Sequence, residues 1–241
     1  KAIINKEVEI IGDRFEYNRK NEVLSVEGNV KINDSINNVT TEAEKVIYFK
    51  KQEKLLSEGI TKIKLENDHT INSKNITLLL DKNEISSNEN TTVSDLENNF
   101  YNANKFRYLI KKKLFRGNEV VLTTSQGDEY LFKDAFINLE TKEIHGKDFE
   151  ANLTHSTFGN LNNEPRFKGN KVYSNDNITS ISKGAFTTCK KRENKNCPPW
   201  LVEAKEVEHN KNKKIITYKN AWLKVYDVPV MYFPYFFHPD P

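Results

Sequence analysis

Apolar and polar residues alternate along most of the chain with a period of two. The alternation is clear in residues 22–32, 62–65, 106–110 and 149–153. Successive side chains of a β-strand point to opposite faces, so each run predicts a strand with one inward row and one solvent-facing row. Clusters of turn-forming residues, such as 18–21, separate these runs. No long window has helical spacing, and the sequence therefore predicts an all-β chain.

Glycines recur at a nearly constant interval, which indicates an internal repeat. Gly28, Gly59, Gly117 and Gly146 are separated by 31, 58 and 29 residues, and the middle interval is twice the last. The missing member falls near Asn88, which can replace glycine at a turn or a bulge. A period of this size predicts stacked units that cannot bury an apolar face alone.

The pattern changes after about residue 156. A polar connection leads into further strands and a cysteine-containing loop, and residues 200–207 and 215–225 predict a hairpin. The last fourteen residues, 228–241, are rich in aromatic residues and prolines, and the prolines exclude a central strand. This segment would suit a membrane interface or, equally, a tail packed over one end of a sandwich. We therefore divide the chain into a repeat-built part, 1–165, and a C-terminal part, 166–241.

Composition and charge exclude several classes of function. The formal net charge is only +3, and acidic and basic residues are closely interleaved, which argues against a nucleic-acid-binding face. No apolar run approaches the roughly 20 residues of a membrane-spanning helix, and residues 1–4 lack the features of a signal peptide. The five histidines are scattered, without metal-site or triad spacing. We expect no catalytic site, no metal and no cofactor.

Cys189 and Cys197 lie close together in a polar stretch. Their spacing suits a local disulfide in an oxidising compartment, and two unpaired thiols are the alternative.

The C-terminal third resembles the lipopolysaccharide-assembly protein LptD, the organic solvent tolerance (OstA-like) family. The resemblance rests on Cys197-Pro198-Pro199-Trp200, which leads into a predicted strand, and on Val228-Pro229-Val230-Met231-Tyr232-Phe233-Pro234-Tyr235. His238-Pro239-Asp240-Pro241 follows as in α-proteobacterial members, and Val26-Glu27-Gly28-Asn29-Val30 resembles one OstA-type repeat unit. The match is specific over the last sixty residues and extends only to the fold class before them.

This resemblance implies an elongated antiparallel β-jellyroll, a V-shaped twisted stack of two sheets that is open along one side. It implies the periplasmic domain of an outer-membrane lipopolysaccharide translocon, in which a hydrophobic groove holds lipid A acyl chains and passes them to a barrel. The implied partners are lipopolysaccharide, an LptA-like bridge protein and an LptE-like plug lipoprotein. In family members with inter-domain disulfides, cysteines of this domain pair with cysteines of the barrel, so Cys189 and Cys197 could pair there or with each other.

Alternation assigns one set of residues to the inward face, and the resemblance makes that face the lipid groove. Without the resemblance, the same set would more often form the closed core of an ordinary sandwich. The predicted groove residues are Leu24, Val26, Val30, Ile32, Ile63, Leu65, Ile76, Leu78, Leu80, Phe106, Tyr108, Ile110, Val120, Leu122, Phe149, Ala151 and Leu153.

Strand edges offer a second predicted contact. Residues 6–11 alternate and contain no proline, so Val8, Ile10 and Ile11 could form an edge strand that pairs with a bridge protein. Two rival functions stay open: a free-standing periplasmic bridge or chaperone of the same fold, and a carbohydrate-binding or adhesive β-solenoid with a sealed core.

Overall fold

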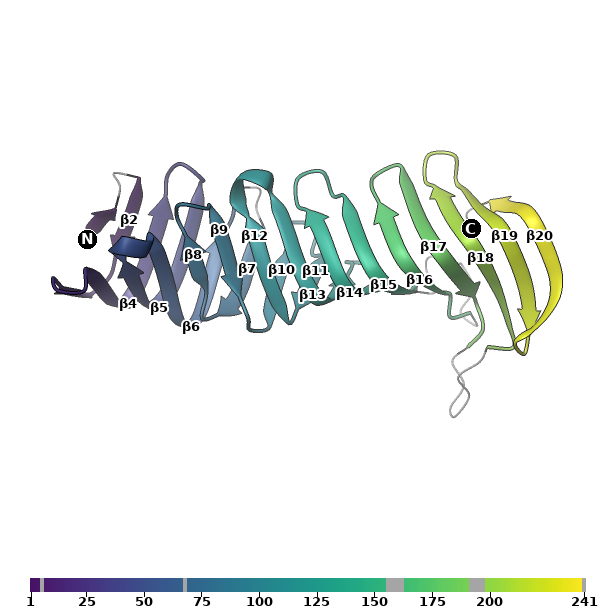
Figure 1. The fold of residues 1–241 in the computed structure, drawn as a ribbon, viewed down its shortest axis with the longest axis horizontal. Coiled ribbons are helices and arrows are strands. Elements are labelled where there is room, and N and C mark those ends of the chain that lie inside the picture. The colour runs from purple at the N-terminus through teal and green to yellow at the C-terminus, as the bar shows by residue number, and fades with distance from the viewer. Residues whose placement is uncertain (5–6, 67–68, 155–162, 191–197, 240–241) are drawn as a thin grey trace. The chain divides into compact units, whose positions relative to one another are not determined.

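The computed structural model describes residues 1–4, 7–66, 69–154, 163–190 and 198–239 and divides the chain into two compact units. The first unit comprises residues 1–119 and 138–140, and the second comprises residues 120–137 and 141–241. Almost all regular structure is antiparallel β-strand, so the predicted all-β class is confirmed (Figure 1). Within the described ranges, the helical segments are two short 3-10 turns, η1 (Lys50–Gln52) and η2 (Ile110–Lys112).

The described part of the first unit contains twelve strands and the beginning of a thirteenth, which continues into the second unit. Side chains cap several of its turns as the sequence predicts: Asn18 Oδ1 accepts the amide protons of Lys20 and Asn21. The strands are β1 (Ala2–Ile4), β2 (Val8–Ile11), β3 (Arg14–Asn18), β4 (Val23–Asp34), β5 (Val39–Phe49), β6 (Lys54–Lys64), β7 (Thr70–Lys74), β8 (Thr77–Leu79), β9 (Glu84–Ser87), β10 (Thr91–Ser94), β11 (Phe100–Ala103), β12 (Lys105–Leu109) and β13 (Leu114–Thr123).

Long strands of the first unit pair with two short strands end to end. The first half of β4 pairs with β3 and its second half pairs with β2, while β6 pairs with β8 and then with β7. Each of these long strands therefore bends where its pairing passes from one short strand to the other. Gly28 and Gly59 lie at such bends with φ of 79° and 81°, a conformation that glycine adopts without steric cost. The predicted role of these two glycines in a bulge or turn is confirmed.

The second unit is a meander in which each strand pairs with its neighbour in sequence. Its strands are β14 (Glu129–Asn138), β15 (Ile144–Asn152), β16 (Arg166–Ser174), β17 (Ile178–Thr187), β18 (Trp200–Asn210), β19 (Ile215–Val225) and β20 (Val228–Pro239). The predicted hairpin of residues 200–225 is β18–β19. Residue 165, where the sequence suggested a domain boundary, lies inside this unit, just before β16, which pairs directly with β15.

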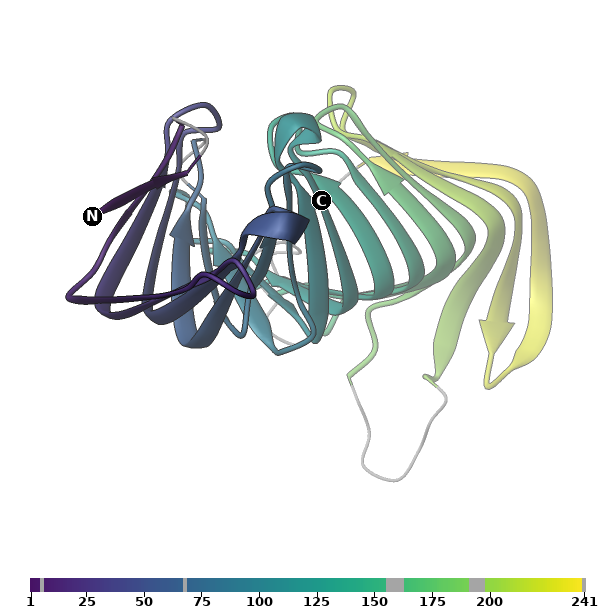
Figure 2. The same cartoon turned by 60° about the vertical axis from the view of Figure 1, so that its left-hand side comes forward.

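All strands of the second unit bend at the same level, as Figure 2 shows. The pairing between neighbouring strands is interrupted there, and Asp148, Lys183 and Asn220 adopt positive φ near 50° at the interruption. Pro234 stands opposite Asn220, where β20 makes no ladder pair and needs no N–H donor. The bend divides each strand into two halves. The inner faces of these halves surround the interior of the unit.

Gly146 has a different role from Gly28 and Gly59, although it belongs to the same predicted repeat. Its φ is not positive, so the bulge role predicted for it is wrong. A Cβ on Gly146 would collide with the ring of Phe132. Close packing of a neighbouring ring, rather than backbone conformation, requires glycine at this position.

Candidate functional site

Pairing across the strands arranges the inner face of the second unit in apolar rows. Each row crosses the unit from strand to strand, and its members are brought together from segments distant in sequence. On the side of the bend nearer the turns after β16 and β18, one row contains Gly146, Val172, Ile181, Val207 and Tyr218. On the other side of the bend, another row contains Ala151, Phe167, Phe186, Val202 and Leu223.

These rows enclose an apolar pocket of about 380 Å³. Its size falls in the range of about 300–1,000 Å³ that is usual for small-molecule sites. Aromatic rings pack along its wall, with Phe132 and Phe149 centroids 5.4 Å apart. The apolar lining consists of Leu122, Tyr130, Phe132, Ile144, Phe149, Ala151, Leu153, Phe167, Val172, Ile181, Val207 and Ile216.

Small residues lie at the bend and let neighbouring side chains pack over it. Gly169, Gly184, Ala204 and Ala221 lie at the bend on β16 to β19. A Cβ on Gly184 would come within 2.6 Å of a Val207 methyl carbon, and one on Gly169 would come within 2.2 Å of an Ile181 methyl carbon. The side chains of Ile181 and Val207, which line the pocket, therefore occupy the space over these glycines.

Polar groups line one end of the pocket, where the turns after β16 and β18 meet. The hydroxyls of Ser174 and Thr179 lie 2.8 Å apart, and the Lys211 ammonium donates to Ser174 Oγ at 3.3 Å and to the carbonyl oxygen of Asn175 at 2.5 Å. His209 and Lys142 also line this end. The pocket thus has an apolar body and a polar end, where Lys142 and Lys211 supply positive charge and Asp176 supplies a carboxylate.

Burial changes the acid–base properties of two groups in this pocket. Burial raises the pKa of Tyr130 to about 12, and the nearby Asp128 carboxylate adds to the effect. Burial lowers the pKa of Lys211 below its ordinary value, while Asp176 opposes the shift. Tyr130 therefore stays a neutral phenol at neutral pH, and the charge at the pocket comes from its polar end.

Inward side chains of the first unit pack closely. The space among Ile32, Val46, Leu55, Ile63, Ile76 and Leu78 measures only about 10 Å³, which is too small for an acyl chain. Phe106 and Phe115 stack with centroids 5.7 Å apart, and Ile63, Ile71 and Ile85 are fully buried. These described residues form a packed core.

The predicted groove residues fall into these two interiors. Val26, Val30, Ile32, Ile63, Leu65, Ile76, Leu78, Phe106, Tyr108 and Ile110 are buried in the first unit, where Leu24 and Leu80 are half-buried. In the second unit, Leu122, Phe149, Ala151 and Leu153 line the pocket, and Val120 is buried outside its lining.

Most of the pocket lining comes from strands that the sequence analysis did not assign to a groove. Tyr130, Phe132, Phe167, Val207 and Ile216 all lie on β14 to β19. A signal was present for two other lining residues, Val172 and Ile181, because residues 171–173 and 178–181 alternate in the same way as the earlier runs. Tyr130 and Phe132 lie before residue 153 and were left out of the predicted inward set.

The edge-strand prediction for Val8, Ile10 and Ile11 is wrong. These residues form β2, which pairs with β1 on one side and with β4 on the other, so its backbone groups are already paired. Among the described strands of the first unit, the outer ones at this end are β1 and β3, which pair only with β2 and β4 respectively.

Of the two cysteines, Cys189 is described and Cys197 lies outside the described residues. Cys189 is half-buried with a free thiol, whose Sγ lies 3.9 Å from the carbonyl oxygen of Trp200. The disulfide prediction therefore stays a prediction.

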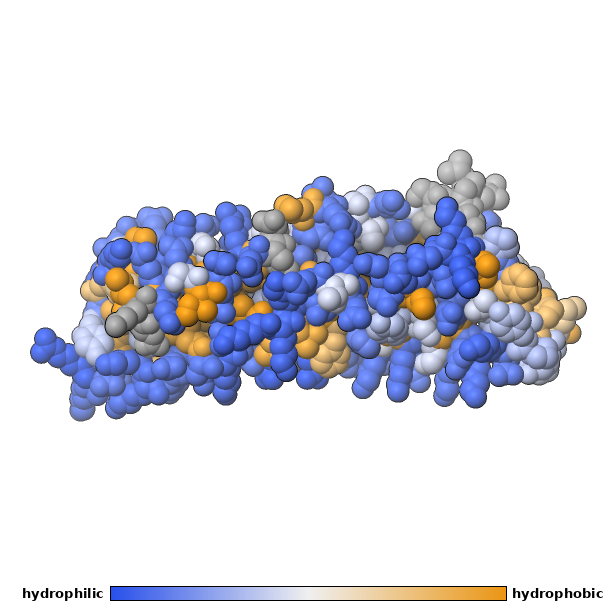
Figure 3. All heavy atoms as spheres, turned by 90° about the horizontal axis from the view of Figure 1, so that it is seen from above, coloured by the Kyte–Doolittle hydropathy of each residue, from blue (hydrophilic) through white to orange (hydrophobic). Residues whose placement is uncertain are grey.

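The aromatic segment expected near the C-terminus is the strand β20, and it is exposed. Within the described part of the chain β20 pairs only with β19. Its aromatic side chains include Tyr232, whose ring is tilted against that of Trp222 with centroids 4.9 Å apart, and hydrophobic atoms are visible at the end that carries β20 (Figure 3). The exposed apolar side chains of β20 are Val228, Val230, Met231, Tyr232, Tyr235 and Phe237.

Two further searches concern the described residues alone. None of their helical segments is long and apolar enough to cross a membrane. No group of three or more histidine, cysteine, aspartate or glutamate side chains among them is arranged to hold a metal ion.

Comparison with known proteins gives one solved structure of interest. The sequence matches no protein-family model and no curated protein. The chain is similar to LptH of Pseudomonas aeruginosa, described as the LptA-homologous periplasmic component of the lipopolysaccharide transport device. The match has 11% identity and a TM-score of 0.25 and covers 58% of this chain and 81% of the other, and a TM-score of that size does not establish a common fold.

Proposed function

We propose that this chain carries lipid acyl chains in the pocket of its second unit, as a periplasmic domain of the lipopolysaccharide transport system. The observation that carries the proposal is the apolar pocket of about 380 Å³ between the two halves of the bent strands. Each methylene that moves from water into such a pocket gains about 0.8 kcal/mol. A chain of several methylenes is held there without a strong polar anchor.

The family resemblance supplies the lipid's identity. Pro198-Pro199-Trp200 leads into β18, which contributes Val207 to the pocket wall, and residues 228–235 form β20. The C-terminal motifs, which carry the specific part of the resemblance to the LptD family, therefore belong to the unit that contains the pocket. Lipopolysaccharide is accordingly the cargo that we propose, with its lipid A acyl chains inside.

The translocon role is a finer part of the proposal and is supported by β20. An exposed strand with one paired side and apolar side chains would otherwise promote aggregation, and a partner that covers it removes that hazard. We propose that β20 faces the outer-membrane barrel, with the LptE-like plug bound beyond it. An LptA-like bridge protein would pair with β1 or β3, because β2 has no free side.

A sealed-core solenoid is the second candidate, and the packed interior of the first unit favours it. In that case the first unit would serve as a rigid spacer. The two candidates differ in whether the second unit takes lipid.

Photo-crosslinking separates these candidates. The photoreactive residue p-benzoylphenylalanine replaces one aromatic residue at a time in the full chain, which is then irradiated with purified lipopolysaccharide. Phe167 on β16 lines the pocket, Tyr173 on the same strand lies on the outer face, and Phe106 lies in the packed core of the first unit.

We expect a lipopolysaccharide adduct from position 167 only. Adducts from neither 167 nor 106 would reject lipid carriage and favour the sealed solenoid. Equal labelling from 167 and 173 would indicate unspecific surface binding and would also reject the proposal.

A further inference from the structure

The Lys211 ammonium is held at the polar end of the pocket by the turn that carries it. It lies in the turn between β18 and β19, and its backbone N–H donates to the carbonyl oxygen of Asn177 at 2.9 Å. The neighbouring Asn212 donates to Asn177 Oδ1 at 2.9 Å. These bonds tie the turn after β18 to the turn after β16 and fix the backbone from which the Lys211 side chain extends over the pocket.

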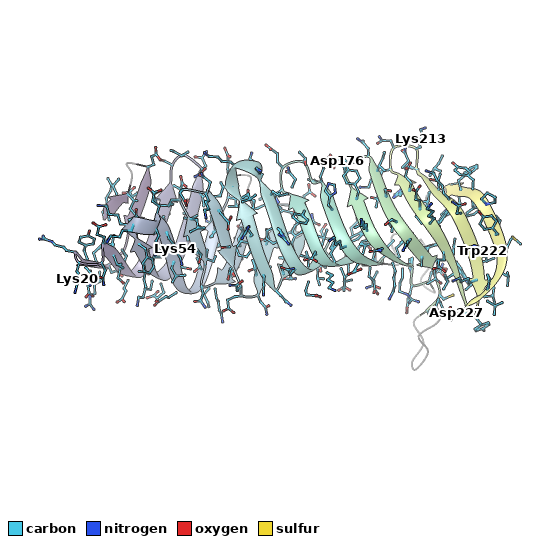
Figure 4. The ribbon with its side chains drawn as sticks, viewed as in Figure 1. Lys20, Lys54, Asp176, Lys213, Trp222 and Asp227 are labelled. Atoms are coloured by element: carbon cyan, nitrogen blue, oxygen red, sulfur yellow. The ribbon has the colours of Figure 1, made fainter. Side chains whose placement is uncertain are left out.

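The Lys211 ammonium has only neutral partners within hydrogen-bond distance. It donates to Ser174 Oγ and to the Asn175 carbonyl oxygen, and within the described part of the chain no carboxylate forms an ion pair with it. Asp176 is exposed at the tip of the turn after β16, as Figure 4 shows, and acts on Lys211 only at longer range. The ammonium is half-buried and can donate its third proton to a ligand.

Half-burying an ammonium without an opposite charge costs free energy, and an anion bound beside it removes that cost. The anion would sit where the apolar wall of Ile144 and Ile216 meets Ser174. A ligand that fills both regions must combine an alkyl chain with a negative headgroup.

We propose that Lys211 binds the headgroup phosphate of the amphiphile whose chain occupies the pocket. This inference rests on the proposed lipid-carrying function and adds to it the group that recognises the headgroup. Lys142 lines the same end and adds positive charge, Asp176 lines it with the opposite charge, and Ser174 and Asn175 orient the ammonium.

The test uses two probes with the same chain, octyl phosphate and octyl glucoside, each below its critical micelle concentration. Their dissociation constants for the full chain are measured by isothermal titration calorimetry, with inorganic phosphate as a third probe. The variants are Lys211→Met, which keeps the length of the side chain, and Lys211→Arg, which keeps its charge. Lys213→Met is the matched control, because Lys213 is exposed in the same turn (Figure 4).

We expect the wild type and Lys213→Met to bind octyl phosphate about tenfold more tightly than octyl glucoside, since a charge-assisted hydrogen bond gains more than a neutral one. Lys211→Met should lose this preference while its affinity for octyl glucoside stays the same, and Lys211→Arg should keep most of it. Inorganic phosphate alone should bind too weakly to compete, because it lacks the alkyl chain.

Three results would overturn the inference. Equal binding of both alkyl probes by the wild type, or an undiminished preference in Lys211→Met, would remove the headgroup role and leave the lipid-carrying function intact. Competition by inorganic phosphate as strong as that of octyl phosphate would indicate a plain anion site. If neither alkyl probe binds the wild type, the proposed function itself fails.

Discussion

The two units use similar bent strands and differ in what occupies the bend. In the first unit the bend is filled by buried hydroxyl groups: Thr61 Oγ1 donates to Ser57 Oγ at 2.7 Å, and the hydroxyls of Ser73 and Thr91 lie 2.7 Å apart. In the second unit the bend carries glycine and alanine instead, and a pocket of about 380 Å³ remains. One architecture therefore gives a packed core in one unit and a ligand site in the other.

Alternation alone therefore does not distinguish a core from a groove. Both interiors are built from inward valine, isoleucine, leucine and aromatic residues. Their difference depends on the few residues that determine how closely the two halves of a strand approach. The first three predictions below each contrast one residue of the first unit with a matched residue of the second, and the last two concern the second unit alone.

The largest difference is expected from truncating one isoleucine in each unit. Ile63→Ala should lower the free energy of unfolding by about 4 kcal/mol, because the packed core cannot relax into the new cavity. Ile216→Ala should cost about 2 kcal/mol, since Ile216 already borders a cavity and has fewer packing partners to lose. Urea unfolding, followed separately for each unit, measures both values, and equal costs would contradict the comparison.

Enlarging a buried alanine should destabilise the first unit more than the second. Ala103→Leu in the first unit should cost about 1–3 kcal/mol through overpacking. Ala151→Leu should change the stability of the second unit by less than about 1 kcal/mol, because the added carbons enter the pocket, and it should weaken octyl glucoside binding. Thermal unfolding and calorimetric titration test both arms. Severe destabilisation by Ala151→Leu would show that the pocket is not open space.

Removing one hydroxyl from each unit should give a smaller contrast. Thr61→Val should cost about 1–2 kcal/mol, because Thr61 is fully buried and its partner Ser57 loses a hydrogen bond that water cannot replace. Thr179→Val should cost less than about 0.5 kcal/mol, since Thr179 is half-buried at the polar end of the pocket, where water can replace it as the partner of Ser174. Denaturant midpoints measured at one pH compare the two variants.

Lys211 should contribute little to stability and more to binding. Its pKa is lowered by burial, so the folded state disfavours the ammonium, and this cost is present at neutral pH and disappears as the pH rises through the lowered pKa. Lys211→Met should therefore leave the free energy of unfolding unchanged to within about 1 kcal/mol at pH 7.

The pH dependence of octyl phosphate binding tests the role of Lys211 further. The preference for octyl phosphate should decline as the pH rises through the pKa of Lys211, which lies below the ordinary lysine value of 10.5. His209, Lys142 and Asp176 are the other titratable groups near this end. A preference that stays constant to pH 10.5 would assign the anion binding to another group.

The strands and turns could be predicted from the sequence because they depend on local patterns. Alternation marked most strands, and turn-forming residues such as residues 18–21 marked the connections between them. The edge strand could not be found in this way. Residues 2–4 are too few to show alternation, yet they form β1 and cover one side of β2.

The pocket could be predicted only in part. Phe149 and Ala151 were assigned inward by alternation, and they do line it. Whether they border open space depends on Phe167, Val172 and Ile181, which come from other strands and meet them only through the register of the sheet. The presence of open space depends on the side-chain volumes of several strands together, so it cannot be predicted from the sequence of one strand.

The central claim is that an alkyl chain enters the second unit and not the first. Methyl NMR of isoleucine-labelled full-length chain, titrated with octyl phosphate, tests it directly. We predict that the methyl signals of Ile144, Ile181 and Ile216 shift in a saturable way, while those of Ile63, Ile71 and Ile85 stay unchanged. Shifts of equal size in both sets, or shifts in the first unit alone, would contradict the account.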